Sequence, residues 1–316
     1  MALQQKEAFI LGKVNGQPMQ IGTWWWNLHG IWESVHNTEP GEAIDLLIQN
    51  NITNIYLDVS GMYDDAQTDG DPKAATFSQV RSFIRTCNLF GISVSALTGA
   101  SRDTCKRWID PERGYPEIKG FFDKIEFFNA FSEEDERFIG VHIDVEPHSI
   151  SDFPTNRAFY FNRYIALMNY ISERAHQSGL RVETDICANF LEEDVVSVNG
   201  KNVKLLDAIF DACDLIAVMA YRHSAERQMD FGTRHYIPYA EKYNTILMVG
   251  SETMPPCDDL TIDDIPPSIT YATVGWDKMV EEITKLQHIL LDETSATVGI
   301  SVHHVHSWID LVRESA

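Results

Sequence analysis

The chain has 316 residues, 44% of them hydrophobic, and a formal net charge of −22. Such an acidic surface argues against binding to nucleic acid or to an anionic membrane, and it favours neutral or cationic ligands. No apolar run reaches the roughly 18 residues that a transmembrane helix needs. The length suits one large domain, because α/β barrels commonly run to about 200–250 residues or more.

The cysteines and the N-terminal residues indicate the cellular compartment in which the protein is found. Five cysteines are scattered without a CxxC pair, which indicates a reducing compartment with no disulfide framework or zinc knuckle. Residues 1–16 lack the basic-then-apolar pattern of a signal peptide. We therefore expect a cytoplasmic protein, with secretion by another route left open. The sequence leaves the oligomeric state open.

Strand and helix patterns alternate along the chain. Residues 9–21 predict a hairpin that turns at Asn15-Gly16. Strands are predicted at 22–27, 52–60, 92–97, 140–146, 180–187, 215–221, 245–250 and 297–302. Helices are predicted at 38–50, 73–90, 121–138, 155–179, 203–213, 236–243 and 276–291. Residues 100–120 and 254–268 are predicted as loops, and long connections of this kind often bind ligands.

Eight strands in alternation with helices predict a single-domain (β/α)₈ barrel over residues 1–316, with residues 1–21 as an N-terminal hairpin extension. The alternative is a doubly wound open sheet. That fold usually has a glycine-rich turn after its first strand, whereas here the chain reads Trp-Trp-Asn-Leu-His-Gly. Neither GxxxxGK[ST] nor GxGxxG occurs, so no nucleotide cofactor is expected.

Two acids end the apolar stretch 138–148. Asp144 and Glu146 are two residues apart, so they project to the same side of a strand. Two carboxylates held close in a partly dry site repel each other, so one can keep its proton near neutral pH. The plainer interpretation is that Glu146 meets a cationic partner at the end of a strand.

Active sites of barrels lie at the carboxyl ends of the strands. The candidate residues there are Trp26, Asp58, Asp144, Glu146, Asp185, Tyr221, Arg222, Glu252, His304 and Trp308. Of three consecutive tryptophans, we expect at least one in the core, and one at the strand end could lie against a sugar ring. No lysine ends a strand, which argues against Schiff-base chemistry.

Three segments resemble family 18 glycoside hydrolases, the chitinase-like barrels. Asp144-Val145-Glu146 looks like the end of that family's acidic motif, Met219-Ala220-Tyr221 is similar to its Met-x-Tyr, and Trp308 resembles its tryptophan platform. The family's earlier acids correspond to Ile139 and His142. The resemblance implies Glu146 as the general acid. It also implies that Asp144 and Tyr221 contact an acetamido group, and that Trp308 is the floor of the sugar site.

A second resemblance is to the large glycosidase clan that carries its acid/base and nucleophile on the fourth and seventh strands. Glu146-Pro147 and Glu252 occupy these places, although Val145 stands where the clan has Asn. This resemblance implies that Glu252 attacks the sugar carbon while Glu146 protonates the leaving oxygen.

Two further hypotheses stay open. His304 and His306, with Asp144 and Glu146, could hold a divalent metal that activates water. Alternatively, the barrel could bind a sugar or another partner without turnover. The sequence on balance predicts a glycoside hydrolase that acts on a carbohydrate, or on another small neutral or cationic substrate, without a cofactor.

Overall fold

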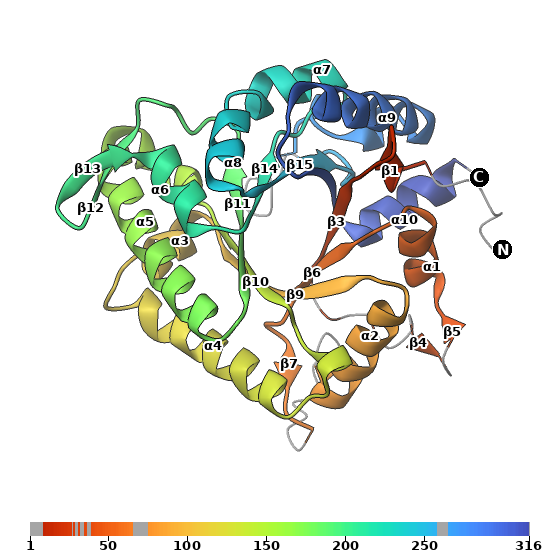
Figure 1. Ribbon diagram of the computed structural model, residues 1–316, viewed down its shortest axis with the longest axis horizontal. Coiled ribbons are helices and arrows are strands. Elements are labelled where there is room, and N and C mark those ends of the chain that lie inside the picture. The colour runs from red at the N-terminus through yellow and green to blue at the C-terminus, as the bar shows by residue number, and fades with distance from the viewer. Residues whose placement is uncertain are drawn as a thin grey trace.

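The computed structural model describes residues 9–26, 28, 31, 35–36, 39–65, 75–257 and 265–315. In these ranges eight parallel strands close a barrel that is surrounded by helices (Figure 1). Around the barrel the strands are β3 (Gln20–Trp25), β6 (Asn54–Asp58), β9 (Ser93–Ala100), β10 (Gly140–Val145), β11 (Arg181–Cys187), β14 (Leu215–Met219), β15 (Ile246–Glu252) and β16 (Val298–His303). The predicted (β/α)₈ barrel is confirmed.

The helices follow the strands in sequence and cover the outside of the barrel (Figure 1). They are α1 (Glu42–Gln49), α2 (Phe77–Leu89), α3 (Arg102–Trp108), α4 (Gly114–Ala130), α5 (Phe153–Gln177), α6 (Leu205–Ala212), α7 (Ala225–Gln228), α8 (Ile237–Tyr243), α9 (Trp276–Glu293) and α10 (Val305–Glu314). Two-residue strands form three small sheets: β1 (Lys13–Val14) with β2 (Gln17–Pro18), β4 (Val35–His36) with β5 (Glu39–Pro40), and β7 (Met62–Tyr63) with β8 (Ala75–Thr76).

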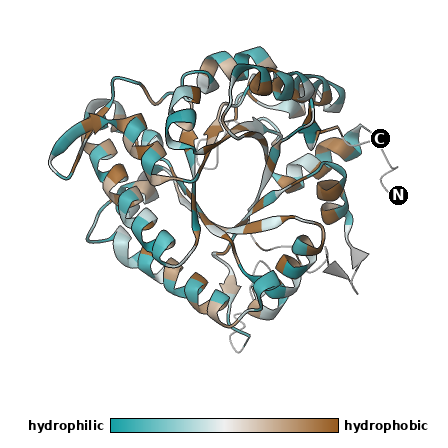
Figure 2. Cartoon of the chain, in the orientation of Figure 1, coloured by the Kyte–Doolittle hydropathy of each residue, from teal (hydrophilic) through white to brown (hydrophobic). Residues whose placement is uncertain are grey.

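The alternation of side chains along each strand separates two environments. In β10, Val141, Ile143 and Val145 are buried in the apolar layer between strands and helices, while His142 and Asp144 point to the inside of the barrel or its mouth. Figure 2 shows both hydrophobic and hydrophilic residues on the outer helices. This pattern is typical of helices that pack on a sheet and face solvent.

The interior of the barrel is filled by side chains, as in other closed eight-stranded barrels. Its apolar residues include Trp24, Tyr56, Leu97 and Met248, which form a cluster separate from the outer core. Polar residues share this interior, and His142 stacks on Tyr56 with ring centroids 3.9 Å apart. The barrel interior beneath the mouth is therefore filled by packed side chains, some of which are charged.

The N-terminal hairpin forms as predicted, with its turn at Asn15-Gly16 between β1 and β2. The backbone N–H of Leu11 donates to Oε1 of Gln287 at 3.1 Å, and Nε2 of Gln287 donates to the Leu11 carbonyl at 2.8 Å. Because Gln287 lies in α9, the hairpin is fixed to the outside of the barrel.

Three predictions about elements were wrong or incomplete. Residues 100–120 form α3 and the start of α4 rather than a loop, so Pro116 lies within the first turn of a helix, where proline is tolerated. The hairpin of β12 (Val195–Val198) and β13 (Lys201–Lys204) was not predicted. Helix α1 begins at Glu42, and the capping residue expected at Thr38 lies outside the described residues.

Two expectations from composition can be compared with the described ranges. All five cysteines fall within them, and none is in a disulfide. Among the residues that the structure describes, no helix has the length and apolar character to cross a bilayer.

Candidate active site

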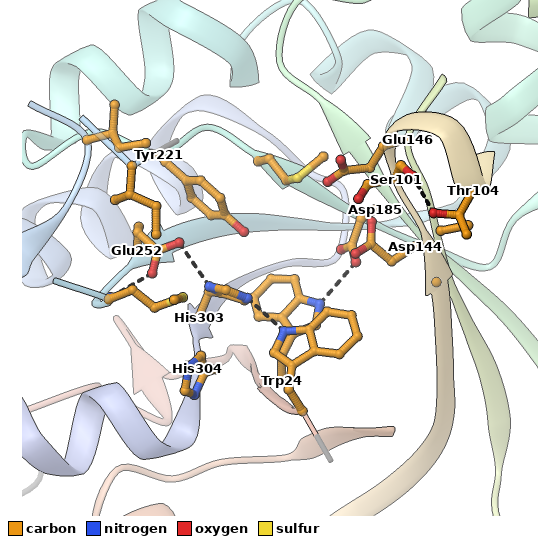
Figure 3. Close-up of a pocket in the computed structure, with 17 residues that line it drawn as sticks. Trp24, Ser101, Thr104, Asp144, Glu146, Asp185, Tyr221, Glu252, His303 and His304 are labelled. Atoms are coloured by element: carbon orange, nitrogen blue, oxygen red, sulfur yellow. Dashed lines mark hydrogen bonds and ion pairs between the residues drawn. The ribbon is translucent and has the colours of Figure 1, made fainter. Parts of the chain in front are cut away.

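A pocket of about 570 Å³ opens at the carboxyl ends of the barrel strands (Figure 3). The described residues that line it are Trp24, Trp26, Gly99, Ala100, Ser101, Thr104, Asp144, Glu146, Asp185, Met219, Tyr221, Glu252, Met254, Ile265, Ile269, His303 and His304. Seven of the ten candidate residues from the sequence are among them. The pocket therefore assembles residues that lie up to 280 positions apart, from Trp24 to His304.

Asp144 and Glu146 enter the pocket from the end of β10 and the residue that follows it. The Glu146 N–H donates to the Ala100 carbonyl at 3.0 Å, which continues the pairing of β10 with β9 beyond Val145. A side chain at Gly99 would not fit, because its Cβ would lie 2.6 Å from the Asp144 carbonyl oxygen. Glycine at position 99 thus allows the close approach that brings both acids to the rim.

Glu252 ends β15 and is nearly fully buried. Its Oε1 accepts the backbone N–H groups of Thr253 at 2.8 Å and Met254 at 2.7 Å, and its Oε2 lies 2.9 Å from Nδ1 of His303. A carboxylate offers about four acceptor sites. Three donors occupy three of them, so one site on Oε2 remains for a ligand in the pocket.

The partners of His303 determine its tautomer. The indole Nε1 of Trp26 lies 2.7 Å from Nε2 of His303, and an indole nitrogen can only donate. Nε2 of His303 must therefore accept, so its proton is on Nδ1 and is donated to Glu252. Trp26 and His303 together hold the carboxylate of Glu252 in one orientation.

Beneath the pocket, His142 joins two acids inside the barrel. Its Nε2 lies 2.9 Å from Oδ2 of Asp185, and its Nδ1 lies 3.3 Å from Oε2 of Glu183. Trp24 Nε1 also donates to Oδ2 of Asp185, at 3.0 Å. Burial lowers the pKa of His142, but the two carboxylates outweigh that effect and raise it to about 9. The ring is therefore an imidazolium at neutral pH.

Tyr221 lies at the mouth of the barrel, two residues past the end of β14. Its ring fits because position 250 is glycine, whose added Cβ would lie 2.8 Å from the tyrosine Cε1. Burial, followed by the negative charge of Glu252 and then of the other three pocket carboxylates, raises the pKa of Tyr221 well above its usual value. The phenol hence stays protonated and can donate a hydrogen bond to a substrate oxygen.

The carboxylates divide between two sides of the pocket. In Figure 3, Glu252 lies with Tyr221 on one side, and Glu146 lies with Asp144 and Asp185 on the other. His303 and Trp24 lie between the two groups. A ligand seated between the sides would meet a carboxyl group at each flank, which is the arrangement that glycosidic bond cleavage requires.

Three sequence candidates do not line the pocket among the described residues. Trp308, expected as the floor of the sugar site, is fully buried in α10 and packs edge-on against Phe9, with ring centroids 5.9 Å apart. Asp58 accepts from the N–H and the hydroxyl of Ser60 at 3.0 and 2.9 Å. Arg222 places its guanidinium 3.7 Å from the centre of the Phe231 ring. The structure does not bring these three side chains into the pocket that its described residues form.

The histidines after β16 also differ from expectation. His304 lines the pocket, but His306 does not appear among the described lining residues. Nδ1 of His304 accepts the backbone N–H of His306 at 3.2 Å and caps α10. Within the described ranges, no group of three or more His, Cys, Asp or Glu side chains is arranged to hold a metal ion. The ligand set of the metal hypothesis is thus not assembled there.

His303, Trp24 and His142 were not selected from the sequence, although strand phase could have found two of them. Along β16 the inward residues are Gly299, Ser301 and His303, two apart, so His303 rather than His304 continues the series. The same rule pairs Trp24 with Trp26 on the inside and leaves Trp25 in the outer core. The two-acid environment of His142 had no signal in the sequence.

No protein-family description matches this chain, and no curated protein matches it. Solved structures are similar in fold. A fungal beta-1,4-galactanase is 10% identical, with 90% of this chain and 88% of that chain covered and a TM-score of 0.54. The spore cortex-lytic enzyme SleL of Bacillus megaterium QM B1551 is 10% identical, with 94% and 73% covered and a TM-score of 0.52.

The match to catalytic domain 2 of the Ostrinia furnacalis group II chitinase is 11% identical and covers 74% of this chain, with a TM-score of 0.48. The chain spans 64% of the length of that domain, which is less than two thirds. At about 10% identity, the structural similarity to the galactanase and to SleL establishes a common fold and no more. The chain shares its (β/α)₈ fold with barrels that include glycoside hydrolases.

Proposed function

We propose that this protein hydrolyses glycosidic bonds, with Glu146 as the general acid. The observation that supports the proposal most is the pair of glutamates, Glu146 and Glu252, on opposite sides of one pocket at the carboxyl ends of β10 and β15 (Figure 3). Trp26 and Tyr221 line the same pocket and offer aromatic surface for a sugar ring.

The two glutamates have different surroundings, which suits different roles. Glu252 accepts three N–H groups and retains one acceptor site on Oε2, as an ionised nucleophile requires. Glu146 is half-buried at the rim beside Asp144, where a neighbouring negative charge favours the protonated form of a carboxyl group. Glu146 would give its proton to the leaving oxygen while Oε2 of Glu252 attacks the anomeric carbon.

The resulting glycosyl–enzyme ester would then be cleaved by water, with Glu146 now taking the proton from that water. Two successive displacements at the anomeric carbon retain its configuration. In the alternative implied by family 18, the substrate's own acetamido oxygen attacks, Asp144 and Tyr221 hold that group, and Glu252 serves only as structure. Attack by Glu252 and attack by the acetamido oxygen both lead to retention of configuration. The two mechanisms differ in whether Glu252 is needed for turnover.

A panel of oligosaccharides with different sugars and linkages tests the proposal, with products identified by mass spectrometry. The wild type should release shorter sugars from at least one substrate, and Glu146→Gln should bind that substrate without cleaving it. Binding without cleavage by the wild type would favour a non-catalytic carbohydrate-binding barrel. Cleavage that stops with a chelator and returns with a divalent metal would favour the metal-dependent alternative.

A further inference from the structure

The charges around the pocket are of one sign. Four carboxyl groups line it, those of Asp144, Glu146, Asp185 and Glu252, and the described lining residues include neither lysine nor arginine. Arg222 follows the lining residue Tyr221 in the sequence, but its guanidinium lies over the ring of Phe231. A negatively charged ligand would therefore be repelled by the carboxylates on both sides of the pocket.

The histidines in the pocket wall do not offset these charges. His303 accepts from Trp26 at Nε2 and therefore holds a single proton, on Nδ1. Burial, followed by the neighbouring His303 and His306, lowers the pKa of His304 to about 3. Both rings are consequently neutral at physiological pH, and the wall of the pocket carries no cation among its described residues.

The one imidazolium nearby is engaged below the pocket floor. His142 lies between Asp185 and Glu183, and Arg181 is paired with the far side of Glu183. Two cationic and two anionic groups thus balance inside the barrel. Asp185 is the one pocket carboxylate that belongs to this balanced set, so the other three gain no compensation from it.

Asp185 has an oxygen that the fold leaves unused. Its Oδ2 lies within hydrogen-bonding distance of both Trp24 and His142, whereas its buried Oδ1 has no hydrogen-bond partner among the described residues. Asp185 is only 3% exposed and lines the pocket. Leaving a buried acceptor unsatisfied costs free energy, so a ligand that brings a donor to the pocket floor gains affinity there.

From these observations we infer that the pocket selects a saccharide bearing a protonated amine, with the ammonium group held on the carboxylate side that includes Asp185. The inference rests on the proposed function and specifies its substrate class. An ammonium group donates up to three hydrogen bonds and carries the charge that the wall lacks. A sugar with a free amine has no acetamido oxygen to attack its own anomeric carbon. Its cleavage therefore requires attack by a protein carboxylate such as Glu252, or by a water molecule that a carboxylate activates.

Isothermal titration calorimetry with four trisaccharides, built of glucosamine, N-acetylglucosamine, glucose or glucuronic acid, tests the inference. At about pH 6, where such an amine carries a proton, the glucosamine trisaccharide should bind at least about tenfold more tightly than the glucose one. The glucuronic acid trisaccharide should bind most weakly. Equal affinities for the amine and the neutral sugar, or a preference for the acidic one, would overturn the inference.

Asp185→Asn tests the site itself. The amide oxygen should take the position of Oδ2, because the two donors Trp24 and His142 face that position. The amide NH₂ group then stands where Oδ1 was and can no longer accept a hydrogen bond. The preference for the amine should then fall to about threefold or less. Asp211→Asn is the matched control, because it removes one carboxylate from the exposed surface of α6, and it should keep the full preference. An unchanged preference in Asp185→Asn would refute the assignment of this subsite.

Hydrolysis assays on the same trisaccharides separate this inference from the proposed function. Cleavage of neutral sugars without any amine preference would reject the inference and leave the proposed function standing. Amine-selective binding without cleavage of any substrate would reject the proposed function and support the amine subsite. Amine preference that disappears when calcium or magnesium is added would identify the carboxylates as a cation site and would also reject the saccharide assignment.

Discussion

Nε2 of His142 lies 2.9 Å from Oδ2 of Asp185, and the histidine is fully buried inside the barrel. The pKa of His142 is raised from 6.5 to about 9, because its two carboxylate partners outweigh the opposing effect of burial. A pKa that is higher in the folded state stabilises the fold below about pH 6.5, and this contribution is lost as the pH rises through about 9.

The free energy of unfolding should therefore fall by roughly 3 kcal/mol between about pH 6 and pH 9.5 from this group alone. His142→Gln should lose most of that dependence, measured by urea denaturation at both pH values. His288→Gln, at an exposed position in α9, should keep the dependence of the wild type. The same pH dependence in wild type and His142→Gln would mean that His142 is neutral in the folded protein.

The tautomer of His303 is a second prediction. Because Trp26 donates to Nε2 at 2.7 Å, the ring proton should be on Nδ1. Nitrogen-15 NMR of histidine-labelled protein should show an unprotonated Nε2 and a protonated Nδ1 for this residue. Trp26→Phe removes the donor, so the preference for this tautomer should weaken. A proton on Nε2 in the wild type would contradict the arrangement around Glu252.

Trp26 and Trp308 form a matched pair of substitutions. Trp308→Phe should lower the free energy of unfolding by roughly 1–3 kcal/mol, since the residue is fully buried, and should leave the KM unchanged. Trp26→Phe should raise the KM several-fold with a stability change of about 1 kcal/mol or less, because the indole lines the pocket. Chemical denaturation and steady-state kinetics on both variants provide the comparison. If Trp308→Phe raises the KM and Trp26→Phe does not, Trp308 rather than Trp26 contacts the sugar.

The role of Glu252 is a prediction about mechanism. Glu252→Ala should reduce turnover by on the order of 10³-fold or more, and added azide should restore part of the activity by attacking the anomeric carbon in place of the carboxylate. The product would be a glycosyl azide of inverted configuration, detectable by NMR. Asp144→Ala should show no azide rescue. Near-normal turnover of Glu252→Ala would instead favour attack by a substrate acetamido group.

The sequence predicted the barrel because the strand and helix periods are regular, and because each strand ends near a polar residue. It also placed Asp144, Glu146 and Glu252 at the mouth of one barrel, since every parallel strand ends on the same side. These are properties of local pattern and topology. They need no knowledge of how side chains pack.

The placement of the other site residues depends on how side chains pack, and this cannot be read from a single sequence. Helix α10 begins at Val305, immediately after the rim, and turns Trp308 into the core. Arg222 lies past the end of β14 and places its guanidinium over the Phe231 ring, a contact that depends on how the following segment folds. The pairing of His142 with Glu183 and Asp185 joins two strands about 40 residues apart, and the neighbouring sequence gives no sign of it.

The assignment of Glu146 as proton donor is the central claim, and it is the same under both glycosidase mechanisms. The measurement is the turnover of Glu146→Gln on a natural oligosaccharide and on an aryl glycoside whose leaving group needs no proton. The account predicts a loss of roughly 10²–10⁴-fold on the natural substrate, a much smaller loss on the aryl glycoside, and substrate binding close to that of the wild type. Wild-type turnover of the natural substrate by Glu146→Gln would contradict it.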